Sequence, residues 1–168
     1  MGIAITLQQH LDAEGVQYDC VEHKRTSCTM RSAEVSHVAG DSVAKAVVLK
    51  RRDSFILAVV PASRQVRLDG VGDWLHQPVS LATELEFAPL FPDCQPGAVP
   101  AVAAAYHLRS LVDESLERNE DIYFEGGDHR TLVHLSREAF HRLMRTVPHG
   151  HFCAEPESAD VDGNYGGA

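Results

Sequence analysis

The chain has 168 residues, 44% of them hydrophobic and 23% charged, which is an ordinary composition for one soluble globular domain. Its formal net charge of −9 argues against non-specific nucleic-acid binding, because a protein that binds the backbone needs a basic footprint. The N-terminus lacks a basic region followed by a long apolar run, and no apolar stretch reaches the roughly 20 residues of a membrane span. We therefore expect a cytoplasmic protein with no membrane partner.

The cysteines and the distribution of charged residues give two further indications about the class of protein. The four cysteines include no Cys-x-x-Cys pair, so neither a disulfide framework nor a zinc knuckle is predicted. No Lys or Arg follows Arg145, and setting aside the four acidic residues beyond position 154 leaves 20 acidic and 15 basic residues, or −5. Local basic patches on the folded part therefore remain compatible with the composition.

In the first half of the chain, helical and strand-like patterns alternate. Apolar residues at helical spacing predict a helix over 3–14 that ends at Gly15. A strand is expected over 16–21, leading to His23, and a second helix near 30–38. Two apolar runs, 46–49 and 55–60, surround a charged turn and predict a central strand pair covered on both faces.

The second half of the chain contains clearer signals for where helices and strands begin and end. A short helix is predicted over 67–76, and a capping box from Thr83 to Glu86 opens another through Leu90. Clustered prolines make 91–100 a shaped loop. Strands follow over 106–113, 121–125 and 131–135, and Ser136 caps a last helix through Arg145. We expect one domain over 1–147 and a disordered acidic tail over 148–168, where apolar periodicity ends.

Lys45 is the first candidate functional residue, because it opens the first central strand. An ammonium group at the edge of an apolar sheet is held near low dielectric and acts strongly on an anionic or carbonyl ligand. The alternative is a lysine that extends to the surface from a strand end.

Two glycine-containing segments are further candidates. In Gly97-Ala98-Val99-Pro100, the glycine allows close backbone approach to a ligand, and backbone N–H groups there could bind an oxyanion or a carboxylate. A plain turn is the alternative. The segment 126–129 predicts a hairpin turn, after which His129 is either a titrating group facing a cleft or a packing residue.

Several enzyme classes lack their signature in this chain. No nucleophile-elbow pattern surrounds a serine, and no phosphate-binding glycine loop with a lysine occurs. The tract from His149 to Cys153 has a metal-like composition without a second pair of ligands at zinc-like spacing, so no metal site is expected. Classical hydrolases and nucleotidyl enzymes are therefore disfavoured.

Taken in order, these short segments resemble the YbaK / prolyl-tRNA synthetase editing-domain family of standalone or synthetase-attached aminoacyl-tRNA deacylases. The resemblance spans about residues 3–144. The segments that carry it are 18–23, 32–34, 44–49, 60–62, 96–100, 112–115 and 122–129. It implies an α+β fold with a central, mostly antiparallel and partly barrel-like sheet flanked by helices.

The resemblance also implies a site and a partner. Lys45 would lie in a cleft roofed by the 97–100 loop, which would take the aminoacylated 3' end of tRNA and hydrolyse the ester without a metal or other cofactor. An aminoacyl-tRNA synthetase is a second candidate partner. The implied catalytic residues are Lys45, Gly97, Ala98, Val99 and His129, and the implied substrate-binding residues are His23, Ala46, Pro100 and Asp128.

In the expected mechanism, water attacks the ester carbonyl while amides near Gly97 hold the oxyanion. Lys45 would position the terminal adenosine, and His129 or Asp128 would orient the water or the substrate amine. Alanines at 46, 98, 101 and 103 favour a small neutral aminoacyl group, and the chain departs from the family pattern at 46 and at 101–103. The alternatives are a non-catalytic binding module that uses Lys45 as a counter-charge, and a Schiff-base enzyme whose Lys45 must be neutral.

Overall fold

The computed structural model describes residues 2–154, and the strands among them form one mixed sheet. The strand order is β1-β7-β6-β2-β3-β5-β8, with β4 paired to β2. Four of the seven strand pairings are antiparallel and three are parallel. The strands are β1 (Asp19–Glu22), β2 (Val43–Arg51), β3 (Ser54–Pro61), β4 (Ser80–Leu81), β5 (Arg109–Asp113), β6 (Asp121–Glu125), β7 (Thr131–Ser136) and β8 (His149–Gly150). The expected α+β class is confirmed.

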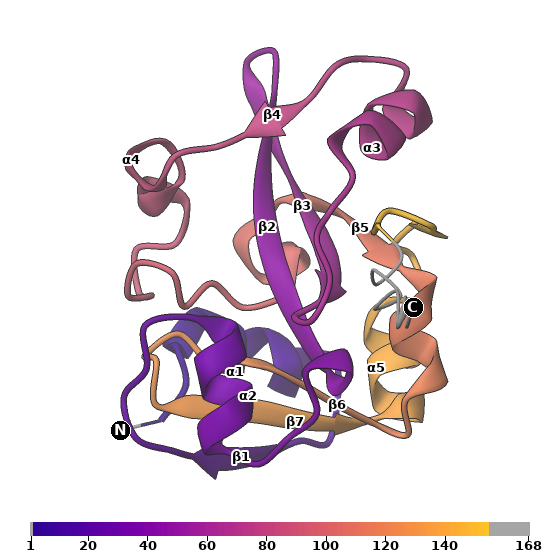
Figure 1. Cartoon of the computed structure of the whole chain (residues 1–168). Coiled ribbons are helices and arrows are strands. Elements are labelled where there is room, and N and C mark those ends of the chain that lie inside the picture. Colours follow the sequence, from indigo (N-terminus) through magenta and orange to yellow (C-terminus); the bar gives the residue numbers. More distant parts are fainter. Residues whose placement is uncertain (1, 155–168) are drawn as a thin grey trace, which may run out of the picture.

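Five short α-helices flank this sheet. They are α1 (Ile5–Ala13), α2 (Thr29–Val35), α3 (Leu68–Leu75), α4 (Glu84–Phe87) and α5 (Arg137–Leu143). Figure 1 shows β2 and β3 as a long pair, with β6 and β7 crossing near the end where β2 begins. The helices α1 and α2 lie at that same end, whereas α3 and α4 lie toward the β2–β3 turn. The start of β2, which carries Lys45, therefore lies next to β6, with which it pairs.

The central strand pair forms because its residues can be buried on both faces. Leu57, Ala58, Val59 and Val60 of β3 are fully buried, and β3 pairs with β2 along its whole length. Burial of such side chains contributes roughly 1.5–3 kcal/mol each for Val and Leu, and the β-branched and aromatic residues in the run favour a strand. The apolar runs thus become strands as predicted.

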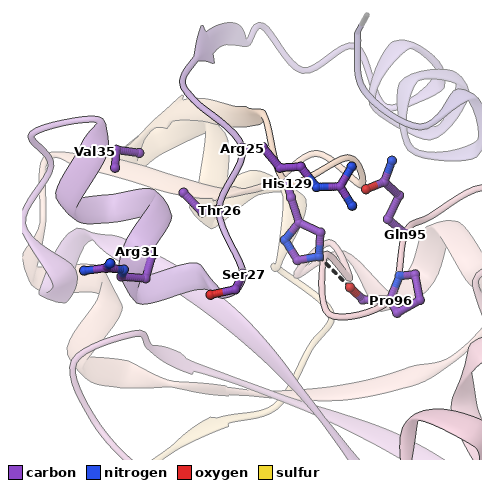
Figure 2. A pocket seen from close by; sticks show the side chains of 8 residues that line it. All are labelled: Arg25, Thr26, Ser27, Arg31, Val35, Gln95, Pro96 and His129. Carbon is purple, nitrogen blue, oxygen red and sulfur yellow. Dashed lines mark hydrogen bonds between the residues drawn. The ribbon is translucent and has the colours of Figure 1, made fainter.

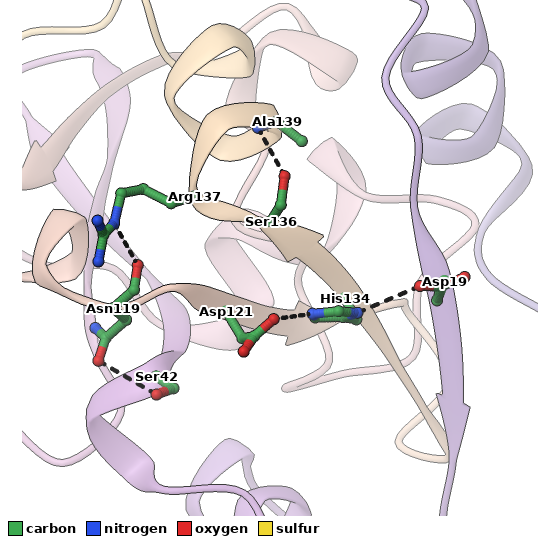
Figure 3. A network of polar contacts seen from close by, with 8 residues as sticks. All are labelled: Asp19, Ser42, Asn119, Asp121, His134, Ser136, Arg137 and Ala139. Atoms are coloured by element: carbon green, nitrogen blue, oxygen red, sulfur yellow. Dashed lines mark hydrogen bonds and ion pairs between the residues drawn. The ribbon is translucent and has the colours of Figure 1, made fainter.

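Local signals in the sequence also act as expected. The capping box at the start of α4 is present: Glu86 N–H donates to Thr83 Oγ1 (3.3 Å), and Thr83 N–H donates to Glu86 Oε2 (2.9 Å). Ser136 Oγ accepts from Ala139 N–H (3.2 Å) and caps α5 (Figure 3). These side chains satisfy helix N–H groups that have no intrahelical partner.

One boundary in the first half was wrong. The first strand begins at Asp19 and not at residue 16, because Val16 N–H donates to the carbonyl of Leu11 (3.1 Å) and so continues the end of α1. Gly15 makes this possible with a φ of +65°. The segment between α1 and β1 is a helix end and not part of the sheet.

A polar network joins the three strands at the β1 edge. His134 of β7 contacts Asp121 of β6 through Nε2 (2.7 Å) and Asp19 of β1 through Nδ1 (3.4 Å), as Figure 3 shows. Its ring also stacks on Tyr123, with ring centroids 4.8 Å apart. This side chain ties the β1 edge strand, which is otherwise mostly exposed, to the rest of the sheet.

The expected domain end at residue 147 was wrong. Residues 149–150 form β8 on the edge of β5, and Phe152 is 1% exposed, with its ring 5.5 Å from that of Trp74 in an edge-to-face contact. Phe152 N–H also donates to Asp113 Oδ2 (2.8 Å). A single large apolar side chain and one buried carboxylate hold this segment without periodic apolar residues. The rest of the predicted tail, residues 155–168, lies outside the described residues.

Candidate functional site

A cavity of about 800 Å³ opens between the segment that leads into α2, the proline-rich loop and the turn after β6 (Figure 2). The residues that line it are Arg25, Thr26, Ser27, Arg31, Val35, Gln95, Pro96 and His129. Among the described residues, its lining contains two arginines and a histidine but no carboxylate, and one of the arginines, Arg31, pairs with Glu34 outside the lining (3.2 Å). The cavity is therefore suited to an anionic or polar ligand.

The turn after β6 holds His129 in a fixed orientation. Asp128 Oδ1 accepts from the N–H groups of Arg130 and Thr131, both at 2.8 Å, and Oδ2 accepts from Thr131 Oγ1 (3.1 Å). His129 then adopts a left-handed φ of 57° and is 5% exposed. Asp128 was expected to bind substrate. Its carboxylate instead accepts hydrogen bonds that shape the turn that carries His129.

The ring of His129 is bound on one side only. Its Nε2–H donates to the carbonyl of Pro96, because a carbonyl oxygen can only accept. In the neutral ring this leaves the lone pair on Nδ1, which is buried and has no hydrogen-bond partner in the part of the chain that the structure describes. The Nδ1 lone pair of His129 is therefore without a partner but shielded from solvent.

The loop from 95 to 100 packs directly on this turn. Gln95 N–H donates to the Gly127 carbonyl (2.8 Å), and Gly97 has a φ of +79°. The Ala98 N–H donates to the Gln95 carbonyl (3.0 Å), so it is occupied. Within residues 2–154, the N–H groups of Gly97 and Val99 make no backbone hydrogen bond. Of the expected oxyanion donors, these two remain available.

The substrate-binding candidates Ala46 and Pro100 have different surroundings. Ala46 packs with Val99 in a cluster on one face of β2, and Pro100 is buried behind the loop. Residues Ala98, Ala101 and Ala103 are at most 1% exposed. These alanines fill the core and do not provide the open space that the sequence suggested.

Lys45 points to the other face of β2. Side chains alternate along a strand, and its neighbours on that face, Val43 and Val47, pack with α2 and with the Phe152 cluster respectively. The structure therefore brings together Pro96, Gly97 and His129 but places Lys45 and the Ala46–Val99 contact on opposite faces of one strand. This alternation argues against a cleft in which Lys45 faces the loop directly.

The charge of Lys45 is held in an unusual setting. Burial lowers the pKa of its ammonium, and the groups that favour its charged form are the thiols of Cys153 and Cys28. Burial next to Asp113 raises the pKa of Cys153 to about 12, so this thiol carries no negative charge at neutral pH. Among the described residues Lys45 has no carboxylate partner. Its charge is therefore available to a ligand.

Glu125, the last residue of β6, is a buried acid that the sequence analysis missed. It is 1% exposed, and its Oε1 accepts from Ser32 Oγ (2.7 Å) of the fully buried Ser32. Burial raises the pKa of this carboxyl group, whereas the charges of His129 and His23 oppose that rise. The available signal was an acidic residue at the end of an apolar strand, directly before two glycines.

His23 completes the polar group around Glu125. Its Nδ1–H donates to the Lys24 carbonyl (2.7 Å), its backbone N–H donates to the Arg130 carbonyl (2.8 Å), and its Nε2 is buried with no partner among residues 2–154. His23 and His129, both predicted from the sequence, thus belong to the electrostatic surroundings of Glu125, an acid that was not predicted.

A second cavity, of about 600 Å³, adjoins the first. Arg25 and Gln95 line both cavities, and Arg130 lines the second together with the start of α1. Neither Arg25 nor Arg130 forms an ion pair with a described carboxylate. Although the chain is acidic overall, two arginines without an ion-pair partner among the described residues line the groove that the two adjoining cavities form, together with Asp93 and Asp128 in the second cavity.

The family model of the aminoacyl-tRNA editing domain matches residues 23–143, which is more than half of the chain and includes His23, Lys45, the loop and His129. The chain belongs to the aminoacyl-tRNA editing domain family. This confirms the resemblance that the motifs suggested. A comparison with curated protein sequences found no match.

Solved structures share the fold of this editing domain. A candidate trans-editing enzyme for prolyl tRNA synthetase superposes with a TM-score of 0.77 at 19% identity, over 89% of this chain and 96% of that one. A protein described only as hypothetical gives 0.79 at 18% identity, over 89% and 99%. A candidate signal transduction protein from Marinobacter aquaeolei gives 0.72 at 14% identity, over 90% of this chain and 31% of that longer one.

Within 2–154, no group of three or more His, Cys, Asp and Glu side chains is arranged to hold a metal ion. No helix in this range has the length and apolar character to cross a membrane.

Proposed function

We propose that this editing domain hydrolyses the ester bond of a mischarged aminoacyl-tRNA in trans and that the amino acid is small and neutral. The observation that carries the proposal is the contact of Gly97 and Pro96 with His129 at the wall of an 800 Å³ cavity. A water-positioning imidazole and free backbone N–H groups are the parts that ester hydrolysis requires.

In this mechanism water attacks the carbonyl carbon of the ester. The N–H groups of Gly97 and Val99 are the candidate donors to the developing oxyanion, each of which is worth about 3–4 kcal/mol in comparable sites. We assign the orientation of this water and the acceptance of its proton to His129 Nδ1, which has no partner but is buried and must become exposed to the cavity when the substrate binds. An aminoacyl ester is already activated, so no covalent nucleophile is needed.

Lys45 acts in this proposal as a cation and not as a nucleophile. Its ammonium lacks a carboxylate partner in the described part of the chain and can hold a phosphate or hydroxyl group of the terminal nucleotide. The Schiff-base alternative needs the neutral amine, which the lowered pKa of Lys45 also favours. Borohydride trapping of a carbonyl ligand on Lys45 would support that alternative.

The charge of the cavity argues against a basic amino acid. Arg25 and Arg31 line it and no carboxylate does, so a basic aminoacyl side chain would lack a counter-charge. The support for small size comes from the tight contact of Gly97 with His129, which leaves little room beside the ester.

A side-by-side deacylation assay tests the proposal. Transfer RNAs charged with alanine, serine, valine, phenylalanine and lysine are incubated with the full chain, and release of each amino acid is measured under single-turnover conditions. We expect alanine or serine to be released fastest and lysine slowest. Discrimination between neighbours in size should be modest, since one methylene group changes binding by roughly 1–3 kcal/mol. Binding of these RNAs without hydrolysis would instead identify a non-catalytic binding module.

A further inference from the structure

We propose that Glu125 is a positioning residue for this hydrolysis: its buried carboxylate orients His129 and balances the positive charge that His129 acquires during the reaction. The inference rests on the proposed function, because it assigns a role within the same site. It concerns a residue that lies behind the cavity and does not line it.

A chain of hydrogen bonds links Glu125 to the backbone of His129. Ser32 Oγ donates to Glu125 Oε1 (2.7 Å) and lies 2.6 Å from Thr26 Oγ1. Thr26 N–H in turn donates to the carbonyl of His129 (3.2 Å). These bonds join β6, α2, the segment before α2 and the turn that carries His129. Glu125 therefore lies at one end of a hydrogen-bond chain that supports the backbone of His129.

Three buried polar atoms in this group lack a partner among residues 2–154. They are Glu125 Oε2, His129 Nδ1 and His23 Nε2, and in each of these side chains the other polar atom is bonded. Buried polar atoms without partners are rare in folded proteins and call for an explanation. In this proposal the explanation is electrostatic, because positive charge on either imidazole favours the carboxylate form of Glu125.

The charged groups around Glu125 are the two histidines and Asp128. His129 and His23 favour the carboxylate, whereas Asp128 and burial oppose it. Because desolvation makes an isolated buried carboxylate costly, the carboxylate form of Glu125 and a protonated histidine stabilise each other. Protonation of His129 during the reaction thereby costs less than it would without the acid.

As the water oxygen bonds to the ester carbonyl carbon, its proton passes to His129 Nδ1. The bond between that carbon and the ribose oxygen then breaks, and the ribose oxygen takes the proton back from the imidazolium. Glu125 remains a carboxylate throughout and acts only through His129.

The test compares Glu125→Gln with Asp113→Asn. The glutamine keeps an acceptor for Ser32 and removes the buried charge, so the variant should fold. Asp113 is a matched control, since it is 2% exposed and bonded by Ser115 and by Phe152 N–H but lies outside the site. We expect Glu125→Gln to lower kcat by about 10–100-fold with little change in KM, and to move the acidic limb of the rate–pH profile to lower pH. Asp113→Asn should leave that profile unchanged.

A readout without substrate separates this inference from the proposed function. The Cε1 proton of His129, assigned from the spectrum of His129→Gln, is followed by NMR from pH 4 to 9. We expect its titration midpoint to fall in Glu125→Gln and to stay unchanged in Asp113→Asn. An unchanged midpoint in folded Glu125→Gln would overturn the inference even if the protein is an active deacylase. A shifted midpoint in a protein that releases no amino acid would keep the His129–Glu125 coupling and refute only the hydrolysis.

Discussion

The backbone of Gly97 lies against the imidazole of His129: a Cβ atom added to Gly97 would be 3.3 Å from His129 Cε1 and 3.6 Å from Glu84 Oε1. A separation of 3.3 Å is tight for a methyl group, so His129 would have to move by a few tenths of an ångström. The same glycine has a φ of +79°, which an L side chain disfavours. The loop and the histidine therefore depend on each other for their positions.

Gly97→Ala should lower deacylation at least 10-fold, because small displacements of catalytic groups are expensive. The positive φ should also cost about 1–2 kcal/mol of stability. Gly15→Ala is the matched control: Gly15 has a φ of +65° but only Arg142 Nη2, at 3.8 Å, near its added Cβ. Urea unfolding should show similar losses for the two variants, while only Gly97→Ala loses turnover. Equal turnover in both would make the 97–100 loop an ordinary turn.

Lys45→Met should abolish deacylation, with a loss of 100-fold or more, and should leave the melting temperature equal or higher. The folded-state pKa of Lys45 is lowered from 10.5, so folding disfavours the ammonium below that folded pKa, and the penalty disappears as pH rises toward 10.5. Any stability gain in the variant should therefore be present at neutral pH and shrink in alkali. Lys50→Met, on the same strand but ion-paired with Glu86, is the control that should remain active. A folded, fully active Lys45→Met protein would remove Lys45 from the site.

Glu125→Gln should be more stable than the wild type at neutral pH. The folded-state pKa of Glu125 is raised above 4.5, so the native state holds the proton more tightly and wild-type stability falls as pH rises from about 4.5 through the folded pKa. The glutamine variant lacks this loss. Chemical denaturation at pH 4, 5.5, 7 and 8 should show a difference that is absent at the lowest pH and grows to a plateau. A difference independent of pH would contradict burial as the cause.

Phe152→Ala should destabilise the domain by about 3–5 kcal/mol, because it removes a fully buried ring from the cluster beneath α3. His151→Ala, next to it, changes an exposed residue that pairs with Glu114 and should cost less than about 1 kcal/mol. A chain ended after Val147 should melt well below one ended after Ala154. Equal melting temperatures for the two truncations would show that the C-terminal segment does not contribute to the fold.

Arg25→Gln and Arg130→Gln should weaken binding of uncharged tRNA with a single-stranded 3' end, measured by fluorescence anisotropy. Each lost phosphate contact should reduce the slope of log affinity against log salt by about 0.7, the value for single strands. Arg145→Gln, an exposed arginine at the end of α5, should change neither affinity nor slope. A loss of the same size in Arg145→Gln would mean that tRNA responds to net charge and not to the groove.

The sequence by itself determined the elements whose signals are local. The capping box at Thr83, the Ser136 cap and the apolar runs of β2 and β3 act within a few residues or through simple burial, and the structure follows them. The order of short motifs was also enough to indicate the family. The sequence placed Gly97 in a loop, as the structure has it, whereas His129 lies within the turn after β6 and not beyond it.

Only the tertiary structure decided how these pieces meet. Strand alternation sends Lys45 and Ala46 to opposite faces of β2, and only the packing of α2 against β6 brings Ser32 to Glu125 across 93 positions of sequence. Likewise, the burial of Phe152 depends on Trp74 and Asp113, which no local pattern near residue 152 reveals. Contacts between distant segments depend on the whole set of packed side chains. The apolar periodicity, which ends at residue 147, therefore cannot show that the segment after it packs against the domain.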